Sequence, residues 1–329
     1  MRIHWAIAIA ACAFAAVALA QAPEPLRVKV FPGAQNLALW AGLERGTFAK
    51  HGVAVDLQFT QNSTELRDGL ASGAFDIAHA AADNAVSMVE IAKRDVVIVM
   101  GCDSGMNELY VQPDVATLVD MRGRTLIVDA PNTAYALKGA GLSPGDYQVK
   151  VAGGTFQRVK AMAESRENAA STLNPPYSFE AAAQGKRSMG RVVDLIGPYQ
   201  GSSAFGMRQW VRDHGPLVER YIAGYVEAQR WATDPANRAA AIALLAERLK
   251  IPPDLAAKSY EALVDPKFGL SPDAKLDVEG LRAVLAIRAE FTGLNDGVAP
   301  PIDRYVEPGP WERAMARLKK GKRKPNLAP

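Results

Sequence analysis

The sequence predicts an α/β protein with two α/β units and a helical C-terminal third. Three observations support this prediction. Between residues 26 and 103, strand patterns and helix patterns alternate in the order β-α-β-α-β-α-β. The alternation restarts at residue 108, and from about residue 209 the chain is almost wholly helical in pattern. Because parallel strands need long crossover connections, this alternation predicts parallel sheets covered by helices.

The first unit opens with a strand over residues 26–31, in which Leu26, Val28 and Val30 alternate with polar residues. A helical pattern over 37–52 follows, and Gly46 interrupts it. The later elements are strands over 53–60, 75–80 and 95–103, a helix capped by Asn62, Ser63 or Thr64, and a helix over 83–94.

The second unit has a similar pattern. It contains strands over 108–112, 124–130, 147–154 and 190–197, a short strand within 168–185, and helices over 132–142 and 155–165. Four helices are expected after it, over 216–234, 235–249, 252–264 and 277–293. The basic stretch over 318–329 is expected to be a flexible tail.

Composition sets broad limits on the kind of protein. The chain has 329 residues, of which 49% are hydrophobic and 22% charged, which suits a globular protein of about two domains. The formal net charge of +3 is small and gives no indication of a nucleic-acid partner.

The first twenty residues differ from the rest of the chain. Arg2 and His4 precede an apolar run over 5–19, and small residues follow at a position suited to signal peptidase. We predict a cleavable signal peptide over residues 1–20 and hence a periplasmic protein. The run is shorter than the roughly 20 residues that span a bilayer. Lipoprotein anchoring at Cys12 stays open as an alternative, because residues 9–12 resemble a lipobox.

Removal of the signal peptide leaves Cys102 as the single cysteine, so no internal disulfide is expected. The apolar run beside Cys102 favours a packed core thiol.

Five predicted strands end in small, amide-bearing or hydroxyl-bearing residues, followed by a helix. These strand ends are residues 32–36, 61–63, 80–84, 130–133 and 153–155. In open α/β sheets, ligands bind beyond the carboxyl ends of the strands, where helix N-termini offer unpaired N–H groups. Two lobes that face each other with such loops would form a cleft suited to reversible capture of a small polar molecule.

Residues 32–86 resemble the NMT1-like group of bacterial ABC solute-binding proteins, which includes nitrate, sulfonate, taurine and thiamine-precursor binders. The matching motifs are Gly46-Thr47-Phe48, Lys50-His51-Gly52-Val53 and Gly73-Ala74-Phe75-Asp76. The resemblance continues through residues 120–137, through Asn174-Pro175-Pro176-Tyr177, and through the C-terminal helices. The stretch "ESRENAASTL" departs from the group's pattern.

The resemblance implies a type II periplasmic-binding fold, with two α/β lobes joined by two crossing strands. Lobe I is expected over 26–106 and 199–329, and lobe II over 107–198. The crossings are expected near 108–112 and 195–203. The resemblance further implies closure around a small organic solute, aromatic, heterocyclic or sulfonate-like, and delivery to an ABC permease in the inner membrane. A monomer without a cofactor is expected.

The candidate ligand-binding residues share a position near the predicted strand ends or in the matching motifs. They are Gln35, Asn36, Trp40, Gln61, Asn62, Ala81, Asp83, Asn84, Asp129, Asn132, Thr133, Gly154, Thr155, Phe156, Asn174 and Tyr177. A stricter hypothesis is that Asn36, Asn62, Asn84 and Thr133 line one cleft between the lobes.

Other residues gave weaker indications. His79, in the predicted strand over 75–80, is expected in the core or behind the ligand contacts. Asp103 and Glu108 lie near predicted cleft ends, where capping is the preferred interpretation and a contact with a ligand N–H the alternative. Arg158 could face an anion, but an exposed helical residue is the preferred interpretation. Because no dedicated pair of arginines is evident, a neutral or aromatic ligand is favoured over nitrate or a simple sulfonate. No metal-ligand spacing, Walker loop or nucleophile elbow occurs.

Two alternatives to an ABC carrier remain open. One is an enzyme similar to pyrimidine-precursor synthases, which resemble the same group. A signal peptide and the lack of an evident Lys–His cofactor set disfavour this alternative, so no enzyme and no catalytic residue is predicted. The other is a binding protein that serves a sensor, which the sequence does not distinguish from a carrier.

Overall fold

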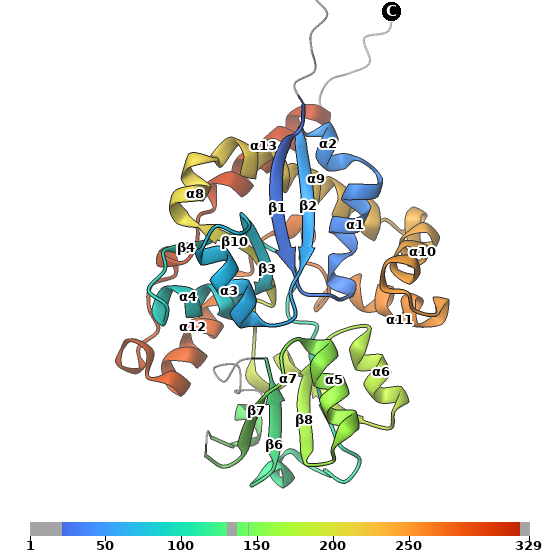
Figure 1. Cartoon of the computed structure of the whole chain (residues 1–329), viewed down its shortest axis with the longest axis vertical. Coiled ribbons are helices and arrows are strands. Elements are labelled where there is room, and N and C mark those ends of the chain that lie inside the picture. The colour runs from blue at the N-terminus through green and yellow to red at the C-terminus, as the bar shows by residue number, and fades with distance from the viewer. Residues whose placement is uncertain (1–21, 130–136, 144, 323–329) are drawn as a thin grey trace, which may run out of the picture.

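Two five-stranded sheets, each covered by helices, form the two lobes of the molecule (Figure 1). The computed structural model describes residues 22–129, 137–143 and 145–322. The predicted signal peptide and Cys12 lie outside these residues.

The first sheet has the strand order β2-β1-β3-β10-β4. Its strands are β1 (Glu24–Val30), β2 (Val53–Phe59), β3 (Ile77–Ala81), β4 (Val96–Gly101) and β10 (Ser202–Met207). Strand β1 runs parallel to β2 and β3, whereas β10 is antiparallel to both β3 and β4.

The second sheet has the order β7-β6-β8-β5-β9. It contains β5 (Glu108–Val111), β6 (Thr125–Val128), β7 (Gln148–Val151), β8 (Asn168–Leu173) and β9 (Arg187–Arg191). Strand β6 is parallel to β7 and β8, and β5 is antiparallel to β8 and β9. Each sheet is therefore mixed, and the prediction of parallel sheets was wrong for β10, β5 and β9.

Two predictions about the later strands were wrong. The pattern over 190–197 was interpreted as a strand, but Val192–Ile196 forms the short helix α7, and the polar stretch Arg187–Arg191 forms the strand before it. Strand β10 was not predicted, because its sequence "SSAFGM" has neither a long apolar run nor clear alternation. It is buried because strands pair with it on both sides.

Helices cover both faces of the first sheet. One face carries α1 (Leu37–Glu44), α2 (Thr47–Lys50), α9 (Gly215–Thr233) and α13 (Gly309–Lys322). The other carries α3 (Ser63–Ala71), α4 (Ala82–Glu90) and α12 (Val278–Thr292). Figure 1 shows the start of β1 and the end of α13 on the same side of this lobe, where α13 packs beside α9.

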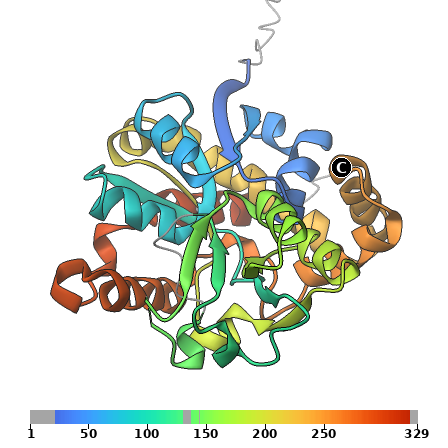
Figure 2. The same ribbon diagram turned by 60° about the horizontal axis from the view of Figure 1, so that its bottom comes forward.

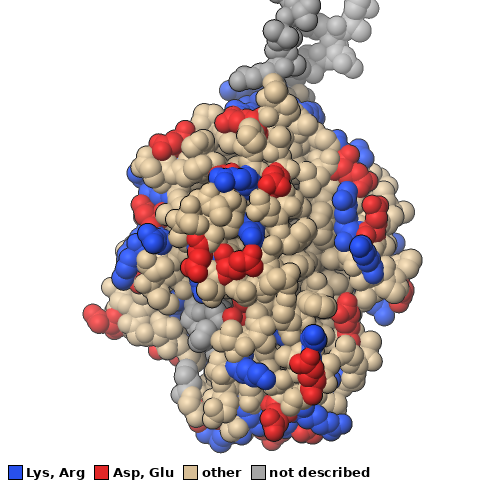
Figure 3. Space-filling model, viewed as in Figure 1, with Lys and Arg blue, Asp and Glu red and all other residues tan. Residues whose placement is uncertain are grey.

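The remaining helices complete the two lobes. Lobe II carries α5 (Thr155–Glu164), α6 (Tyr177–Ala183) and α7 (Val192–Ile196), while α8 (Arg208–Asp213), α10 (Arg238–Leu249) and α11 (Pro253–Leu263) follow the return to the first lobe. Turning the molecule brings lobe II forward, with its helices beside the first lobe (Figure 2). Positive and negative side chains are interspersed on the face in Figure 3, as the small net charge suggests.

Two predicted boundaries need correction. The helix expected over 37–52 is split into α1 and α2 at Gly46, which adopts the left-handed conformation with φ 67°. The tail expected over 318–329 was wrong for its first residues, because Leu318 belongs to α13 and packs against the core of the first lobe.

Two short connections join the sheets. The chain leaves β4 at Gly101 and enters β5 at Glu108, and it returns through residues 197–201 after α7. The first crossing was expected at 108–112, but these residues begin with strand β5, so the connection is residues 102–107. The lobe boundaries given by the sequence, 26–106 with 199–329 and 107–198, stay a prediction.

A buried ion pair connects α4 to α12 in the first lobe. The carboxylate of Asp83 accepts a hydrogen bond from Arg288, and each side chain is only 1% exposed. Burial raises the pKa of Asp83, and the neighbouring guanidinium opposes this effect. The pair fixes the N-terminal turn of α4, where the next residue is Asn84.

Replacing Arg288 by Met should lower the free energy of unfolding by about 3–5 kcal/mol, because it leaves the buried Asp83 without this cation. Urea denaturation followed by circular dichroism measures the loss. Arg282→Met, on the same helix, is the control, because Arg282 is exposed and lies 3.9 Å from Glu279. We expect it to change stability by about 0.5 kcal/mol or less. Equal losses in the two variants would contradict this account.

Candidate functional site

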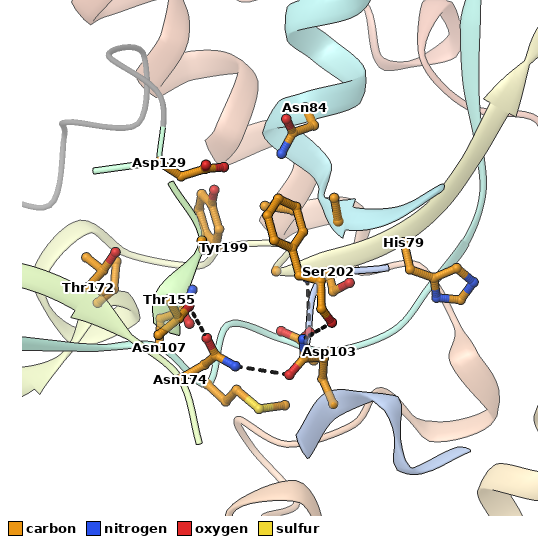
Figure 4. A pocket seen from close by; sticks show the side chains of 18 of the residues that line it. His79, Asn84, Asp103, Asn107, Asp129, Thr155, Thr172, Asn174, Tyr199 and Ser202 are labelled. Atoms are coloured by element: carbon orange, nitrogen blue, oxygen red, sulfur yellow. Dashed lines mark hydrogen bonds between the residues drawn. The ribbon is translucent and has the colours of Figure 1, made fainter. Parts of the chain in front are cut away.

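A pocket of about 150 Å³ lies between the two sheets, beside both connections. Figure 4 shows its side chains approaching from both lobes, with Asn84 and Ser202 on one side and Thr155 and Asn174 on another. Seven of the predicted residues line it: Gln35, Ala81, Asn84, Asp129, Gly154, Thr155 and Asn174. These seven residues lie near strand ends, which is where open α/β sheets bind ligands.

Small residues open the first lobe's side of the pocket. Ala80 and Ala81 end β3, and α4 begins at once with Ala82. These side chains leave room for the pocket, into which Asn84 points from the first turn of α4 (Figure 4). The Oδ1 atom of Asn84 accepts a 3.3 Å hydrogen bond from Arg67.

Several predicted residues have structural roles outside the pocket. Asn36 is buried and donates a 2.7 Å hydrogen bond to the carbonyl oxygen of Phe31. Trp40 lies in the core between α1 and the C-terminal helices. Asn62 caps α3, because its Oδ1 atom accepts a 2.9 Å hydrogen bond from the Glu65 amide. Asn36 and Asn62 of the stricter four-residue hypothesis therefore do not line this pocket.

The other predicted residues outside the pocket also make identifiable contacts. Asp83 pairs with Arg288, and the Gln61 side chain bonds to Gln157. Tyr177 lies in the core of lobe II, and Phe156 contacts its ring, with centroids 6.0 Å apart. Asn132 and Thr133 lie outside the described residues.

Arg158 is the main correction to the predicted site. It was expected to be exposed, but it is only 8% exposed and lines the pocket. Helix α5 begins at Thr155, and side chains in a helix tilt toward its N-terminus, so Arg158 lies against the edge of lobe II that faces the pocket. The amphipathic pattern alone did not reveal this, because the inner face of α5 includes this charged residue.

The guanidinium of Arg158 holds the loops of lobe II. It donates hydrogen bonds to the carbonyl oxygens of Gly153 (2.9 Å) and Thr172 (2.9 Å), and to Oγ1 of Thr155 (3.0 Å). Burial lowers the pKa of Arg158 to about 10, so it stays positively charged at neutral pH. The pocket therefore contains a desolvated cation.

Asp103 is a second charged group in the pocket, for which the sequence favoured capping and left a contact with a ligand N–H as the alternative. It lies in the connection 102–107, is 5% exposed and lines the pocket. Its Oδ1 accepts a 3.0 Å hydrogen bond from the Gly105 amide, and its Oδ2 a 3.0 Å bond from the Ser202 amide. Gly105 belongs to the connection 102–107, and Ser202 is the first residue of β10, directly after the return connection 197–201. Burial raises the pKa of Asp103 from 3.8 to about 6.

Three further lining residues escaped prediction for a common reason. Tyr199, Gly201 and Ser202 lie in the return connection and the unpredicted strand β10. Gly201 approaches Asp103 so closely that a Cβ atom there would lie 1.9 Å from Oδ1. The glycine is therefore required by the close approach of the two connections. A strand without a clear sequence pattern gave no reason to select these residues.

His79 and Cys102 form the pair most similar to a nucleophile and base. Sγ of Cys102 lies 3.4 Å from Nδ1 of His79, and Nε2 of His79 lies 2.7 Å from the hydroxyl of Tyr221. Burial raises the pKa of the Cys102 thiol and lowers that of His79 to about 3. Both groups are therefore neutral at pH 7, and the pair lacks the thiolate that nucleophilic catalysis requires. The preferred sequence interpretation of Cys102, a packed thiol, is confirmed.

Direct contacts between the lobes show that the structure is closed around the pocket. Nδ2 of Asn174 donates a 3.0 Å hydrogen bond to Oε1 of Gln35, and the Gly154 amide donates a 2.9 Å bond to the Gln61 carbonyl oxygen. Each bond joins a strand-end loop of one lobe to a strand-end loop of the other. Opening the lobes would break these contacts.

The raised pKa of Asp103 predicts a specific pH effect on stability. A folded-state pKa above the unfolded value means that the native state holds the proton more tightly, so stability falls as pH rises from about 4 to 6. The full effect of this shift is on the order of 3 kcal/mol. Urea midpoints at pH 4.5 and 7.0 should show this fall in stability in the native chain. Asp103→Asn should remove the part of the fall that Asp103 causes. An identical slope in both proteins would contradict the assignment.

Comparison with known proteins agrees with the fold. Residues 20–155 match the NMT1-like family. No curated protein matches the chain by sequence. A Bordetella bronchiseptica protein has a similar structure, with TM-score 0.76, 15% identity, and 90% of this chain and 98% of that chain covered.

Two further similar structures have named ligands. The periplasmic nitrate-binding protein NrtA from Synechocystis PCC 6803 has TM-score 0.74 and 15% identity, with 93% of this chain and 92% of that chain covered. The alkanesulfonate-binding protein SsuA from Xanthomonas axonopodis pv. citri, bound to MOPS, has TM-score 0.68 and 17% identity, with 87% and 97% covered.

An enzyme also has this fold. The desulfurization enzyme DSZB has TM-score 0.58 and 16% identity, with 89% of this chain and 99% of that chain covered. At these identities the structural matches show the fold alone. The predicted resemblance is confirmed: the chain has the periplasmic binding protein fold, and its residues 20–155 match the NMT1-like family.

Proposed function

We propose that this protein is an exported, periplasmic solute-binding protein that captures a small organic molecule between its lobes and delivers it to an ABC permease. The observation that supports this most strongly is a pocket lined from both lobes beside the two connections. A ligand there contacts both lobes only in the closed form, so its binding favours closure. NrtA and SsuA, which share the fold, bind nitrate and sulfonates.

The lining residues favour an organic ligand with an acidic group. Arg158 supplies a buried positive charge, and burying such a charge is costly unless an anion or several polar groups compensate it. Phe31 and Tyr199 add aromatic surface. The preference for a neutral ligand was based on the lack of a dedicated pair of arginines, and the burial of Arg158 in the pocket now counts against that preference. A sulfonate-like or carboxylate-bearing molecule, aliphatic or aromatic, therefore suits the site better.

The first experiment is a thermal-shift screen of the mature chain from Gln21 against sulfonates, aromatic and aliphatic carboxylates, pyrimidines and nitrate. A ligand at one hundred times its Kd should stabilise the protein by about 2.7 kcal/mol. A stabilising compound that is recovered unchanged supports the carrier. A compound that is chemically consumed supports the enzyme alternative. Failure of every class to bind would contradict the proposal.

Replacing Arg158 should weaken the binding of an acidic ligand and leave the affinity for neutral analogues unchanged. Arg158→Lys keeps a positive charge but loses the planar set of donors, so we expect at least about a tenfold rise in Kd. Lys160→Gln is the control, because Lys160 is exposed on the same helix. Isothermal titration calorimetry measures both, and thermal melting confirms that each variant folds. Equal affinity in Arg158→Lys and the native chain would contradict a role for this guanidinium.

A further inference from the structure

Two buried groups of opposite charge line the pocket, and neither has an ion-pair partner among the described residues. Arg158 belongs to α5 in lobe II, and Asp103 belongs to the connection between the lobes. They are 8% and 5% exposed. Buried charges in proteins are normally paired, because each loses several kcal/mol of hydration. Two unpaired charges in one pocket therefore need a common explanation.

The partners of Asp103 are backbone amides, which bring only partial positive charges. Its two oxygens accept hydrogen bonds from Gly105 and Ser202, one in each chain segment that joins the lobes. The carboxylate is therefore oriented by the connections while a full positive charge near it is missing. Such a group is well placed to accept a hydrogen bond from a cation.

Arg158 likewise has no negatively charged group in hydrogen-bond contact among the described residues. Its terminal nitrogens donate to two carbonyl oxygens and one hydroxyl, which are neutral acceptors. Its Nε atom is buried and has no hydrogen-bond partner in the described part of the chain. The charge of Asp129 acts on the guanidinium from a distance, but no ion pair joins the two side chains in the described part of the chain.

The other carboxylate of the pocket is already engaged. Asp129 accepts a 3.1 Å hydrogen bond from the amide of Ser63, and a second from the Ser63 hydroxyl, at the first turn of α3. These bonds tie it across the lobes, to the positive end of a helix. Asp129 is only partly buried, so Asp103 is the more deeply buried carboxylate of the pocket, and its partners are backbone amides alone.

We propose that the ligand is a small zwitterion, whose anionic group pairs with Arg158 and whose protonated amine pairs with Asp103. This inference depends on the proposed solute-binding function and specifies its ligand. One molecule would then compensate both buried charges. A volume of about 150 Å³ corresponds to about ten water positions, which suits a molecule of about ten non-hydrogen atoms.

The proposed amine contact also couples binding to the hinge. Asp103 joins the two connections through its hydrogen bonds, and Gly201 lies against its carboxylate. An ammonium group at this position would stabilise the carboxylate that holds the connections in the closed arrangement. A ligand that lacks the amine would contact the lobes without this effect on the connections.

Titration of Asp103 should make zwitterion binding depend on pH. The neighbouring groups stay neutral near pH 6, because burial raises the pKa values of Cys102 and Tyr225 and lowers that of His79 to about 3. Arg158 stays charged, since its pKa is about 10. An ammonium ligand binds the ionised form of Asp103, whose pKa is about 6, so affinity should fall about tenfold from pH 7.5 to pH 5.

The test compares three molecules of matched size by calorimetry: 4-(aminomethyl)benzoate, 4-methylbenzoate and 4-methylbenzylamine. An aliphatic set, 5-aminopentanoate, pentanoate and pentylamine, repeats the comparison without the ring. Each zwitterion should bind at least about tenfold more tightly than its anion or cation at pH 7.5. Its advantage over the anion should disappear at pH 5, whereas the cation should lose affinity together with the zwitterion. Asp103→Asn should remove the advantage over the anion at both pH values, while Glu164→Gln, on the exposed face of α5, should keep it.

Several outcomes would overturn the inference. Anions that bind as tightly as the zwitterions would leave the solute-binding proposal intact and remove the amine contact. Loss of the zwitterion's advantage in Asp129→Asn instead of Asp103→Asn would assign the amine to the other carboxylate. The pH comparison uses the native chain, so it decides the question even if Asp103→Asn does not fold. Failure of all six molecules to bind, with a sulfonate or pyrimidine binding in the screen, would reject the zwitterion alone.

Discussion

The hydrogen bonds of the Asp103 carboxylate are the interaction on which the arrangement of the lobes depends most. One oxygen accepts the Gly105 amide and the other the Ser202 amide, so a single buried side chain joins both connections. The side-chain amide of Gln200 also donates hydrogen bonds to the backbone carbonyl oxygens of Asp103 and Ser202. With the two connections fixed side by side, the remaining freedom between the lobes is rotation about this point, which is the motion that opens and closes a cleft.

The strand ends of the two sheets are positioned by this hinge. Asn174 and Gly154 of lobe II meet Gln35 and Gln61 of lobe I, and the pocket lies between these contacts and the connections. These contacts are single hydrogen bonds between neutral groups, each worth about 1 kcal/mol in net stability. The bonds from Ser63 to the Asp129 carboxylate and the exposed ion pair of Lys138 with Glu290 also cross between the lobes. A ligand of modest affinity can therefore decide the balance between open and closed forms. This balance links the geometry of the pocket to a transport function.

The sequence predicted the architecture well and the site only in part. Strands with regular alternation, such as β1, and helices with clear caps, such as α3, follow from local patterns. Strand β10 does not, because its burial depends on pairing with β3 and β4 rather than on its own composition. The same limit applies to the site. Gln35, Asn84 and Thr155 follow strand ends and were found, whereas the burial of Arg158 depends on how α5 packs against lobe II.

The most direct test of the account is a crystal structure of the protein with the strongest ligand from the thermal-shift screen. The account predicts one molecule between the sheets, in contact with side chains of both lobes such as Ser202 and Thr155, with its acidic group at Arg158. A ligand bound on the outer surface, or held by one lobe alone while the other stands open, would contradict the central claim that this protein captures its solute by closure.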